Sequence, residues 1–160
     1  KGCSGHEIDI RAREVMWKEG LDSKCGTGHG VGYMSCVHEG PIGFRFYHRE
    51  GVYDDGILTP GQVITIEPGV YKAYKYGIRL ENDLLIVPAF TSDDGIFYKF
   101  ETITYAPYDR RGIDLTMLDD DELRWLNNYN DMVREKLTPY CKGDADLLAY
   151  LIKVTQPLYR

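Results

Sequence analysis

The most informative segment of this chain is Gly26-Thr27-Gly28-His29-Gly30-Val31-Gly32. Four glycines surround one histidine, and because glycine has no Cβ, the backbone can lie close to whatever the imidazole contacts. So many glycines are unfavourable inside a helix, whereas the segment 33–37, with Tyr, Met, Cys and Val, is typical of an extended strand. We therefore expect a glycine-rich segment that leads into a strand and places His29 in a site.

Two carboxylates further along the chain lie in apolar, β-branched runs. Glu67 follows Val63-Ile64-Thr65-Ile66, and Glu81 follows Gly77-Ile78-Arg79-Leu80. We predict that 63–71 and 77–87 form an antiparallel pair of strands, which sets Glu67 beside Glu81. A carboxylate in a strand core is costly unless a cation or a donor pairs with it, so the pattern indicates a metal site. One imidazole with several carboxylates suits Mn²⁺, Zn²⁺, Fe²⁺ or Co²⁺, and the residues do not choose among these ions.

His38 follows His29 after nine residues, which is an odd offset. Odd offsets on a straight strand point to opposite faces, so a bulge or bend is needed to bring both histidines into one site. Taken alone, His38 fits a hydrogen-bonded structural histidine equally well. Beyond it, the segment 40–61 is rich in Pro and Gly and predicts a long loop with turns, in which His48 is a surface residue.

Length and composition give bounds of their own. With 160 residues the chain predicts about one domain, and 43% hydrophobic residues are enough for a core. The net charge of −6 argues against nucleic acid and anionic membrane as partners, since both need a basic face. No stretch approaches the roughly 20 apolar residues of a membrane span, and the polar first residues do not open a signal peptide. The four cysteines form no CxxC pair, so we expect free thiols and a cytoplasmic location.

Helices are expected near both ends of the chain. The segment 6–19 has an imperfect apolar stripe and predicts a covering helix. Within it, His6 and Asp9 are interpreted as a solvated face and receive no role. A run of four acids after Leu118 suits the positive end of a helix dipole, and 144–154 carries a leucine-rich stripe that predicts a second helix.

Taken in order, the motifs GTGHGVG, VHEGP, TIEPG and GIRLEN, with the tail WLNNY … TQP, resemble the C-terminal part of the catalytic domain of aminopeptidase P. This is the Xaa-Pro aminopeptidase branch of the pita-bread metallopeptidases, family M24, and the resemblance runs from about Gly5 to Pro157. It implies an α+β fold, a curved antiparallel sheet with outer helices that forms an incomplete half of the pita-bread fold. Residues 1–106 would belong to the catalytic domain and 107–160 to a helical C-terminal extension packed on it. A cytosolic homodimer is also implied.

The resemblance also implies a set of roles. His29, Glu67 and Glu81 would bind two divalent metal ions, Mn²⁺ first and Zn²⁺ or Co²⁺ as alternatives. Glu81 would bridge the ions, and Glu67 would also take the proton of the attacking water. His38 would hold the substrate or stabilise charge near the cleaved bond, and Arg79 would orient Glu81. The implied reaction is hydrolysis of the bond between an N-terminal residue and a proline in second position of a peptide.

Two departures from the family pattern limit this reading. Family members draw two aspartate ligands and another histidine from upstream of Gly5, so we expect the chain to be a fragment that binds metal weakly and is inactive alone. Cys25 stands where the family has a histidine, and a thiol does not donate a hydrogen bond as an imidazole does. The alternative is therefore a catalytically degenerate pita-bread module that binds peptides or proteins without cleaving them. A dipeptidase or a methionine aminopeptidase is a third possibility, which VHEGP, WLNNY and TQP disfavour.

Overall fold

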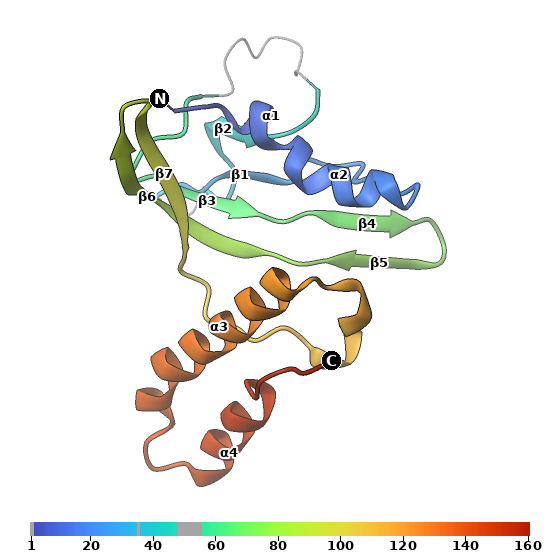
Figure 1. Cartoon of the computed structure of the whole chain (residues 1–160), viewed down its shortest axis with the longest axis vertical. Helices are drawn as coiled ribbons and strands as arrows, with labels where there is room; N and C mark the ends of the chain where they lie inside the picture. Colours follow the sequence, from blue (N-terminus) through green and yellow to red (C-terminus); the bar gives the residue numbers. More distant parts are fainter. Residues whose placement is uncertain (1, 35, 48–55) are drawn as a thin grey trace. The chain divides into compact units, whose positions relative to one another are not determined.

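The computed structural model describes residues 2–34, 36–47 and 56–160. The chain forms two compact units, Lys1–Thr104 and Tyr105–Arg160, and each has its own apolar core. The first unit carries a sheet and two short helices, whereas the second is helical (Figure 1). Every residue proposed for the site lies in the first unit.

The first unit is built on a five-stranded sheet with the order β2-β1-β3-β6-β7, in which neighbouring strands are antiparallel. The β3–β6 pair ends at Ile66↔Asn82, and a hairpin of β4 and β5 begins at Gly69↔Arg79 and continues in the same direction (Figure 1). The predicted antiparallel pair is thus confirmed, as two ladders with a short gap. The strands are β1 Gly28–Gly30, β2 Glu39–Phe44, β3 Val63–Ile66, β4 Gly69–Lys72, β5 Tyr76–Arg79, β6 Asn82–Ser92 and β7 Gly95–Thr102.

The core of this unit lies against the strands that carry the site. Ile64 of β3 is fully buried, and Phe44 of β2 and Ile86 of β6 are each 1% exposed. Burying such a side chain contributes roughly 1.5–3 kcal/mol relative to leaving it in water. Ile42 and Leu58 complete the cluster of buried residues. Because the pleat alternates, the residues next to Ile64 are free to face the other side of the sheet.

The predicted helix over 6–19 is confirmed as two helices, α1 Gly5–Ile8 and α2 Ile10–Lys18. A capping box begins α1: the Ser4 hydroxyl accepts from the amide of Glu7, while the Ser4 amide donates to the Glu7 carboxylate at 2.6 Å. The helix packs beside β2. A Cβ at Gly5 would lie 2.4 Å from the carbonyl oxygen of Gly43, so only glycine allows this approach.

The prediction of a solvated Asp9 is wrong. Asp9 separates α1 from α2 and is only 1% exposed. Arg13, one helical turn later, forms an ion pair with it, and this pairing is what makes burial of the carboxylate tolerable.

The strand expected after the glycine-rich segment is also wrong. The glycine-rich segment itself forms β1, and the described residues of 33–37 lie in bends or irregular backbone, with Tyr33 95% exposed. The predicted loop over 40–61 is wrong at its start, because β2 includes Pro41. Proline is tolerated there because β2 is an edge strand. His48 lies outside the described residues.

The second unit contains the two helices predicted near the C-terminus. The longer one begins at the acidic run, where Asp119 and Glu122 form a capping box: each amide donates to the other carboxylate, at 2.9 and 2.8 Å. Its core combines Tyr129, Val133, Cys141 and Leu151. The helices are α3 Asp120–Leu137 and α4 Ala145–Val154, with 3₁₀ turns at Arg110–Gly112, Leu115–Met117 and Thr138–Cys141.

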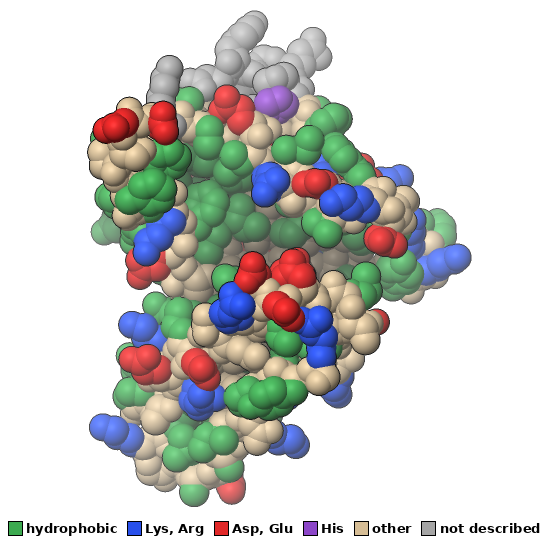
Figure 2. Space-filling model, in the orientation of Figure 1, with side chains coloured by type: hydrophobic (Ala, Val, Ile, Leu, Met, Phe, Trp, Pro, Cys, Tyr) green, Lys and Arg blue, Asp and Glu red, His purple; other side chains and the backbone are tan. Residues whose placement is uncertain are grey.

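The surface carries charges of both signs. On the face shown in Figure 2, Lys and Arg side chains lie among Asp and Glu side chains. Among the described residues, no helix combines the length and the apolar character that a membrane crossing requires. The prediction of free thiols is confirmed for all four cysteines.

Candidate metal centre

His29 lies in β1, and its imidazole is close to that of His38. The two ring centroids are 4.3 Å apart. The ladder between β1 and β2 changes register here, since His29 pairs with Gly43 but Gly30 pairs with Glu39. This irregularity supplies the bend that the odd sequence offset requires. The predicted bend is therefore confirmed, and both imidazoles face the same space.

Glu67 follows the last residue of β3 and is only 8% exposed. Its amide donates to the carbonyl oxygen of Thr27 at 2.7 Å, which ties this point of the chain to the glycine-rich segment. Its carboxylate accepts from the Thr65 hydroxyl at 3.2 Å and from Arg79 Nη1 at 2.8 Å. A buried carboxylate needs such donors, because their hydrogen bonds offset the free energy lost when the group is removed from water.

The orientation of the His29 ring fits a metal ligand. Nδ1 is 2.9 Å from the carbonyl oxygen of Gly30, and since a carbonyl only accepts, Nδ1 carries a proton and donates. Nε2 therefore points at Glu67 Oε1, 2.9 Å away. Histidines that bind metals usually donate their second ring N–H to a carbonyl or a carboxylate. The pair fits as one nitrogen and one oxygen donor of a divalent metal site.

Glu81 is placed differently from Glu67. In the backbone it lies opposite Glu67, because the last pair of β3–β6 and the first pair of β4–β5 flank both positions. Its side chain is exposed, however, whereas that of Glu67 is buried. Within the described residues, no group of three or more His, Cys, Asp or Glu side chains is arranged to hold a metal ion. The structure thus pairs His29 directly with Glu67, and the role of Glu81 as a third ligand stays a prediction.

Arg79 is predicted from the sequence to orient Glu81, whereas the structure pairs it with Glu67. A buried carboxylate loses more than an exposed one by remaining unpaired, which explains the choice of partner. The Arg79 guanidinium also lies over the ring of Tyr71, 5.5 Å from its centroid. Arg79 therefore holds the oxygen of Glu67 that faces away from His29.

A solvent-open cavity of about 470 Å³ adjoins these side chains. Its lining includes Cys25, His29, His38, Arg45, Glu67 and Arg79. Arg45 was not among the residues predicted for the site. A Cβ at Gly43 would lie 1.7 Å from the Arg45 guanidinium, so the glycine two residues earlier gives this side chain its place. A Gly-x-Arg spacing on a strand is too common a signal for the sequence alone to single it out.

Gly28 sets the distance between β1 and β3. A Cβ there would lie 2.1 Å from the carbonyl oxygen of Thr65 and 3.0 Å from the Phe44 ring. Because Gly28 has no side chain, the neighbouring amide of His29 can donate to the Thr65 hydroxyl at 3.1 Å. This close approach brings His29 within reach of Glu67, two residues beyond Thr65.

Comparison with known families was decisive. The model of metallopeptidase family M24 matches residues 1–88, more than half of the chain, and that stretch contains His29, Glu67 and Glu81. The chain belongs to metallopeptidase family M24. A second model, of the C-terminal region of peptidase M24, matches residues 96–158.

Curated relatives of this M24 chain carry the name of Xaa-Pro aminopeptidases. It is 43% identical over 160 residues to "Probable Xaa-Pro aminopeptidase P" of Podospora anserina, which covers 98% of this chain and 23% of the relative. The protein of the same name in Pyricularia oryzae is 44% identical over 161 residues, covering 98% and 25%. The chain thus spans about a quarter of the length of these curated relatives.

A solved structure gives the same result for the fold. The X-prolyl aminopeptidase of Caenorhabditis elegans, described as a cytosolic enzyme with a di-nuclear active site, matches with a TM-score of 0.86 and 37% identity. The match covers 98% of this M24 chain and 25% of the nematode enzyme. The predicted α+β pita-bread fold and the resemblance to aminopeptidase P are confirmed.

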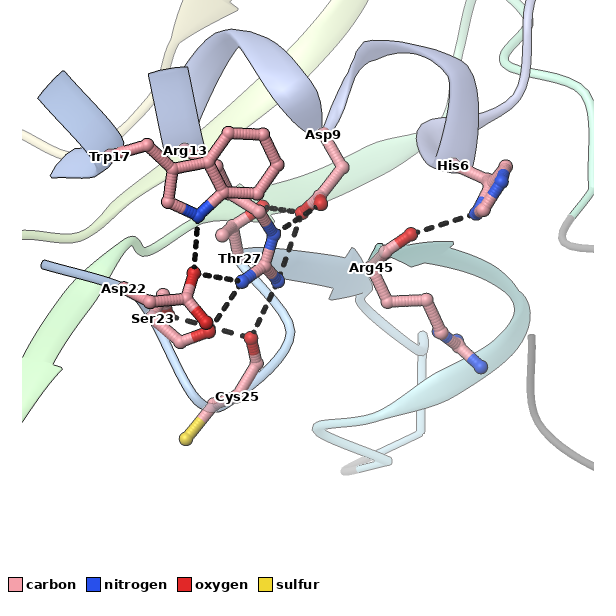
Figure 3. A network of polar contacts seen from close by, with 9 residues as sticks. All are labelled: His6, Asp9, Arg13, Trp17, Asp22, Ser23, Cys25, Thr27 and Arg45. Carbon is pink, nitrogen blue, oxygen red and sulfur yellow. Dashed lines mark hydrogen bonds and ion pairs between the residues drawn. The ribbon is translucent and has the colours of Figure 1, made fainter. Parts of the chain in front are cut away.

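The M24 chain also contains a buried polar network that sequence reasoning missed (Figure 3). Asp9 and Arg13 pair at 2.5 Å, and both are at most 2% exposed. Burial by itself lowers the pKa of the Arg13 guanidinium, but the hydrogen bonds and charges of Asp9 and Asp22 outweigh it and raise the pKa above its ordinary value. The i, i+4 spacing of Asp9 and Arg13 was the available signal.

Proposed function

We propose that this chain carries part of the di-nuclear centre of a metal-dependent Xaa-Pro aminopeptidase. The enzyme would hydrolyse the bond between an N-terminal residue and a proline in second position of a peptide. The observation that carries the proposal is the contact of His29 Nε2 with Glu67 at 2.9 Å, made while Nδ1 donates to a carbonyl. The names of the fungal and nematode relatives supply the substrate class.

Two divalent metal ions are proposed as cofactors, with Mn²⁺ first and Zn²⁺ or Co²⁺ as alternatives. His29, Glu67 and Glu81 would hold them, and ligands from parts of the protein outside these 160 residues would complete the set. When bound, such ions lower the pKa of a water and polarise the scissile carbonyl.

The remaining steps fall to side chains of this chain. Glu67 would accept the proton of the attacking water, while Arg79 donates to its Oε2. Arg79 thereby fixes the orientation of the carboxylate. His38 would donate to the substrate near the cleaved bond, and its ring, 4.3 Å from that of His29 between centroids, supports this role. The cavity of about 470 Å³ gives the peptide access to all four side chains.

The proposed cellular location is that of the nematode relative, which is described as cytosolic. We place this protein in the cytoplasm and expect a homodimer. Small peptides are the expected substrates, rather than nucleic acid or membranes.

Cys25 motivates a second candidate function. It lines the cavity and its residue is exposed, so a thiol stands where a peptide would enter. If this substitution prevents turnover, the site binds peptides or proteins without cleaving them.

The test is Mn²⁺-dependent release of the N-terminal residue from a tripeptide with proline second, using the protein in full. Glu67→Ala is the control that removes the base and ligand, and Arg134→Lys, in the helical unit, controls for substitution as such. Activity in the wild type and the Arg134→Lys protein, lost in Glu67→Ala, supports the aminopeptidase. Metal binding without activity, with activity restored by Cys25→His, supports the binding module instead. We expect the 160 residues alone to be inactive.

A further inference from the structure

We infer that Asp9 and Arg13 are positioning residues that hold His29 and Glu67 at binding distance, acting through the segment 23–27. This inference rests on the proposed function, because it assigns a purpose to the geometry of two proposed metal ligands. Neither Asp9 nor Arg13 lines the cavity at the site. They act through the backbone that carries those ligands.

Arg13 fastens the beginning of this segment. Its Nη1 donates to the carbonyl oxygen of Ser23, and its Nη2 donates to that of Cys25 at 2.8 Å. Neither carbonyl lies in a helix or a strand. Arg13 also reaches Asp22 at 3.3 Å, whose carboxylate accepts from the indole of Trp17 at 2.8 Å (Figure 3). One guanidinium thus satisfies several groups of a turn that has no regular secondary structure to do so.

Asp9 fastens the end of the segment. Its Oδ1 accepts from the hydroxyl of Thr27 at 2.6 Å, and Thr27 is only 1% exposed. Thr27 is where the network meets the site: its amide donates to the carbonyl oxygen of Phe44 at 2.8 Å, and its own carbonyl accepts from the amide of Glu67 at 2.7 Å. His29 follows two residues later. The network therefore controls the position of both proposed ligands through one residue.

Stability alone is a weak reason for this pair. Replacing a buried ion pair by apolar residues of similar volume is often neutral or stabilising, so burial of Asp9 and Arg13 is not evidence that the fold needs their charge. Burying two charged side chains is costly, but they do what apolar side chains do not. They bind main-chain carbonyls and a hydroxyl in fixed directions. Groups that hydrogen-bond directly to metal ligands usually affect metal affinity by about 10- to 100-fold, and we expect an effect in this range from a network that fixes the backbone of two ligands.

Two variants separate positioning from folding. Arg13→Lys keeps the positive charge beside Asp9 but loses the planar fork that reaches two carbonyls. Thr27→Val removes only the hydroxyl and keeps the shape, and Thr27→Ser restores the hydroxyl. Arg134→Lys is the matched control, because Arg134 also donates to a carbonyl, that of Thr155 at 2.8 Å, in the helical unit.

The first readout is amide hydrogen exchange in the protein in full, without metal. We expect at least tenfold faster exchange at the amides of Thr27 and Glu67 in Arg13→Lys and Thr27→Val. The amide of Ile86, which donates to the carbonyl oxygen of Gln62 at 3.0 Å just before β3, should be unchanged. Thr27→Ser should return the rates to the wild-type value, and Arg134→Lys should leave them unaltered. Equal acceleration at Ile86, or none at Glu67, would overturn the positioning role.

The second readout is the affinity for Mn²⁺, measured by calorimetry. Affinity that falls about 10- to 100-fold in both variants and recovers in Thr27→Ser supports the inference. Unchanged affinity despite faster local exchange refutes it. If the wild-type protein binds none of Mn²⁺, Zn²⁺ and Co²⁺, the proposed function fails, and the exchange rates alone decide whether Asp9 and Arg13 position the two side chains.

Discussion

Gly28→Ala tests whether the absence of a side chain at Gly28 sets the distance between β1 and β3, and with it the contact of His29 with Glu67. The added Cβ would lie 2.1 Å from the Thr65 carbonyl oxygen, about 1.3 Å short of the 3.4 Å at which ordinary contact begins. If β1 moves back by that amount, it loses three hydrogen bonds to β3 and the residue after it. These are the bonds donated by the amides of His29, Val31 and Glu67. At about 1 kcal/mol each, the expected loss of unfolding free energy is about 3 kcal/mol.

Urea unfolding measures this loss. Fluorescence of Trp17, in a Trp125→Phe background, follows the first unit alone. With a slope of about 1.5 kcal/mol per M, the midpoint should fall by about 2 M. Gly40→Ala, in the same unit, is the control, because a Cβ there meets nothing within 4 Å. The affinity for Mn²⁺ should fall about 10- to 100-fold in parallel. A Gly28→Ala midpoint equal to that of the control, with unaltered affinity, would refute the reasoning.

Three further outcomes are expected. Hydrogen bonds from the side chain and then the amide of Arg111 lower the pKa of Asp109 from its ordinary 3.8 to about 2. The stabilising contribution of this carboxylate is therefore present above pH 4 and is lost as the pH falls through about 2. Arg111→Gln should move the pKa of Asp109, measured by NMR titration, back toward 3.8. Val133→Ala, at a fully buried position, should cost about 2 kcal/mol in urea unfolding followed by circular dichroism, against less than about 1 kcal/mol for Ile152→Ala, which is 45% exposed. Mn²⁺ at a hundred times its dissociation constant should stabilise the wild-type protein by about 2.7 kcal/mol, and Glu67→Gln should remove most of this gain; an equal gain in both proteins would exclude Glu67 as a ligand.

Regular patterns in the sequence were sufficient for the regular elements. The β-branched run before Glu67 and the acidic run before α3 encode their strand and helix locally, and both predictions were confirmed. The sequence left the role of His38 open and indicated only that a bend is needed if His29 and His38 share one site; the register change in β1–β2 supplies that bend.

Predictions failed where a distant partner decides the conformation. The glycine-rich segment forms β1 because β2 and β3 pair with it from either side. Its own composition does not indicate that pairing. Asp9 is buried because Arg13 and Thr27 meet it from different parts of the chain. The contact of Arg79 with Glu67 was also missed, because the sequence presents Glu67 and Glu81 alike and only burial distinguishes them; the orienting role of Arg79 toward Glu81 stays a prediction.

The constant register across β3–β6 and β4–β5 restricts how this part of the chain can change in length. In the backbone, Glu67 and Glu81 lie opposite each other in the gap between two ladders, and a shift of one residue in a strand turns every side chain to the opposite face. A single insertion or deletion within either strand would therefore separate the two carboxylates. Insertions between Lys72 and Tyr76, at the hairpin tip, leave the facing pair in place. Natural variation in length should accordingly concentrate at that tip.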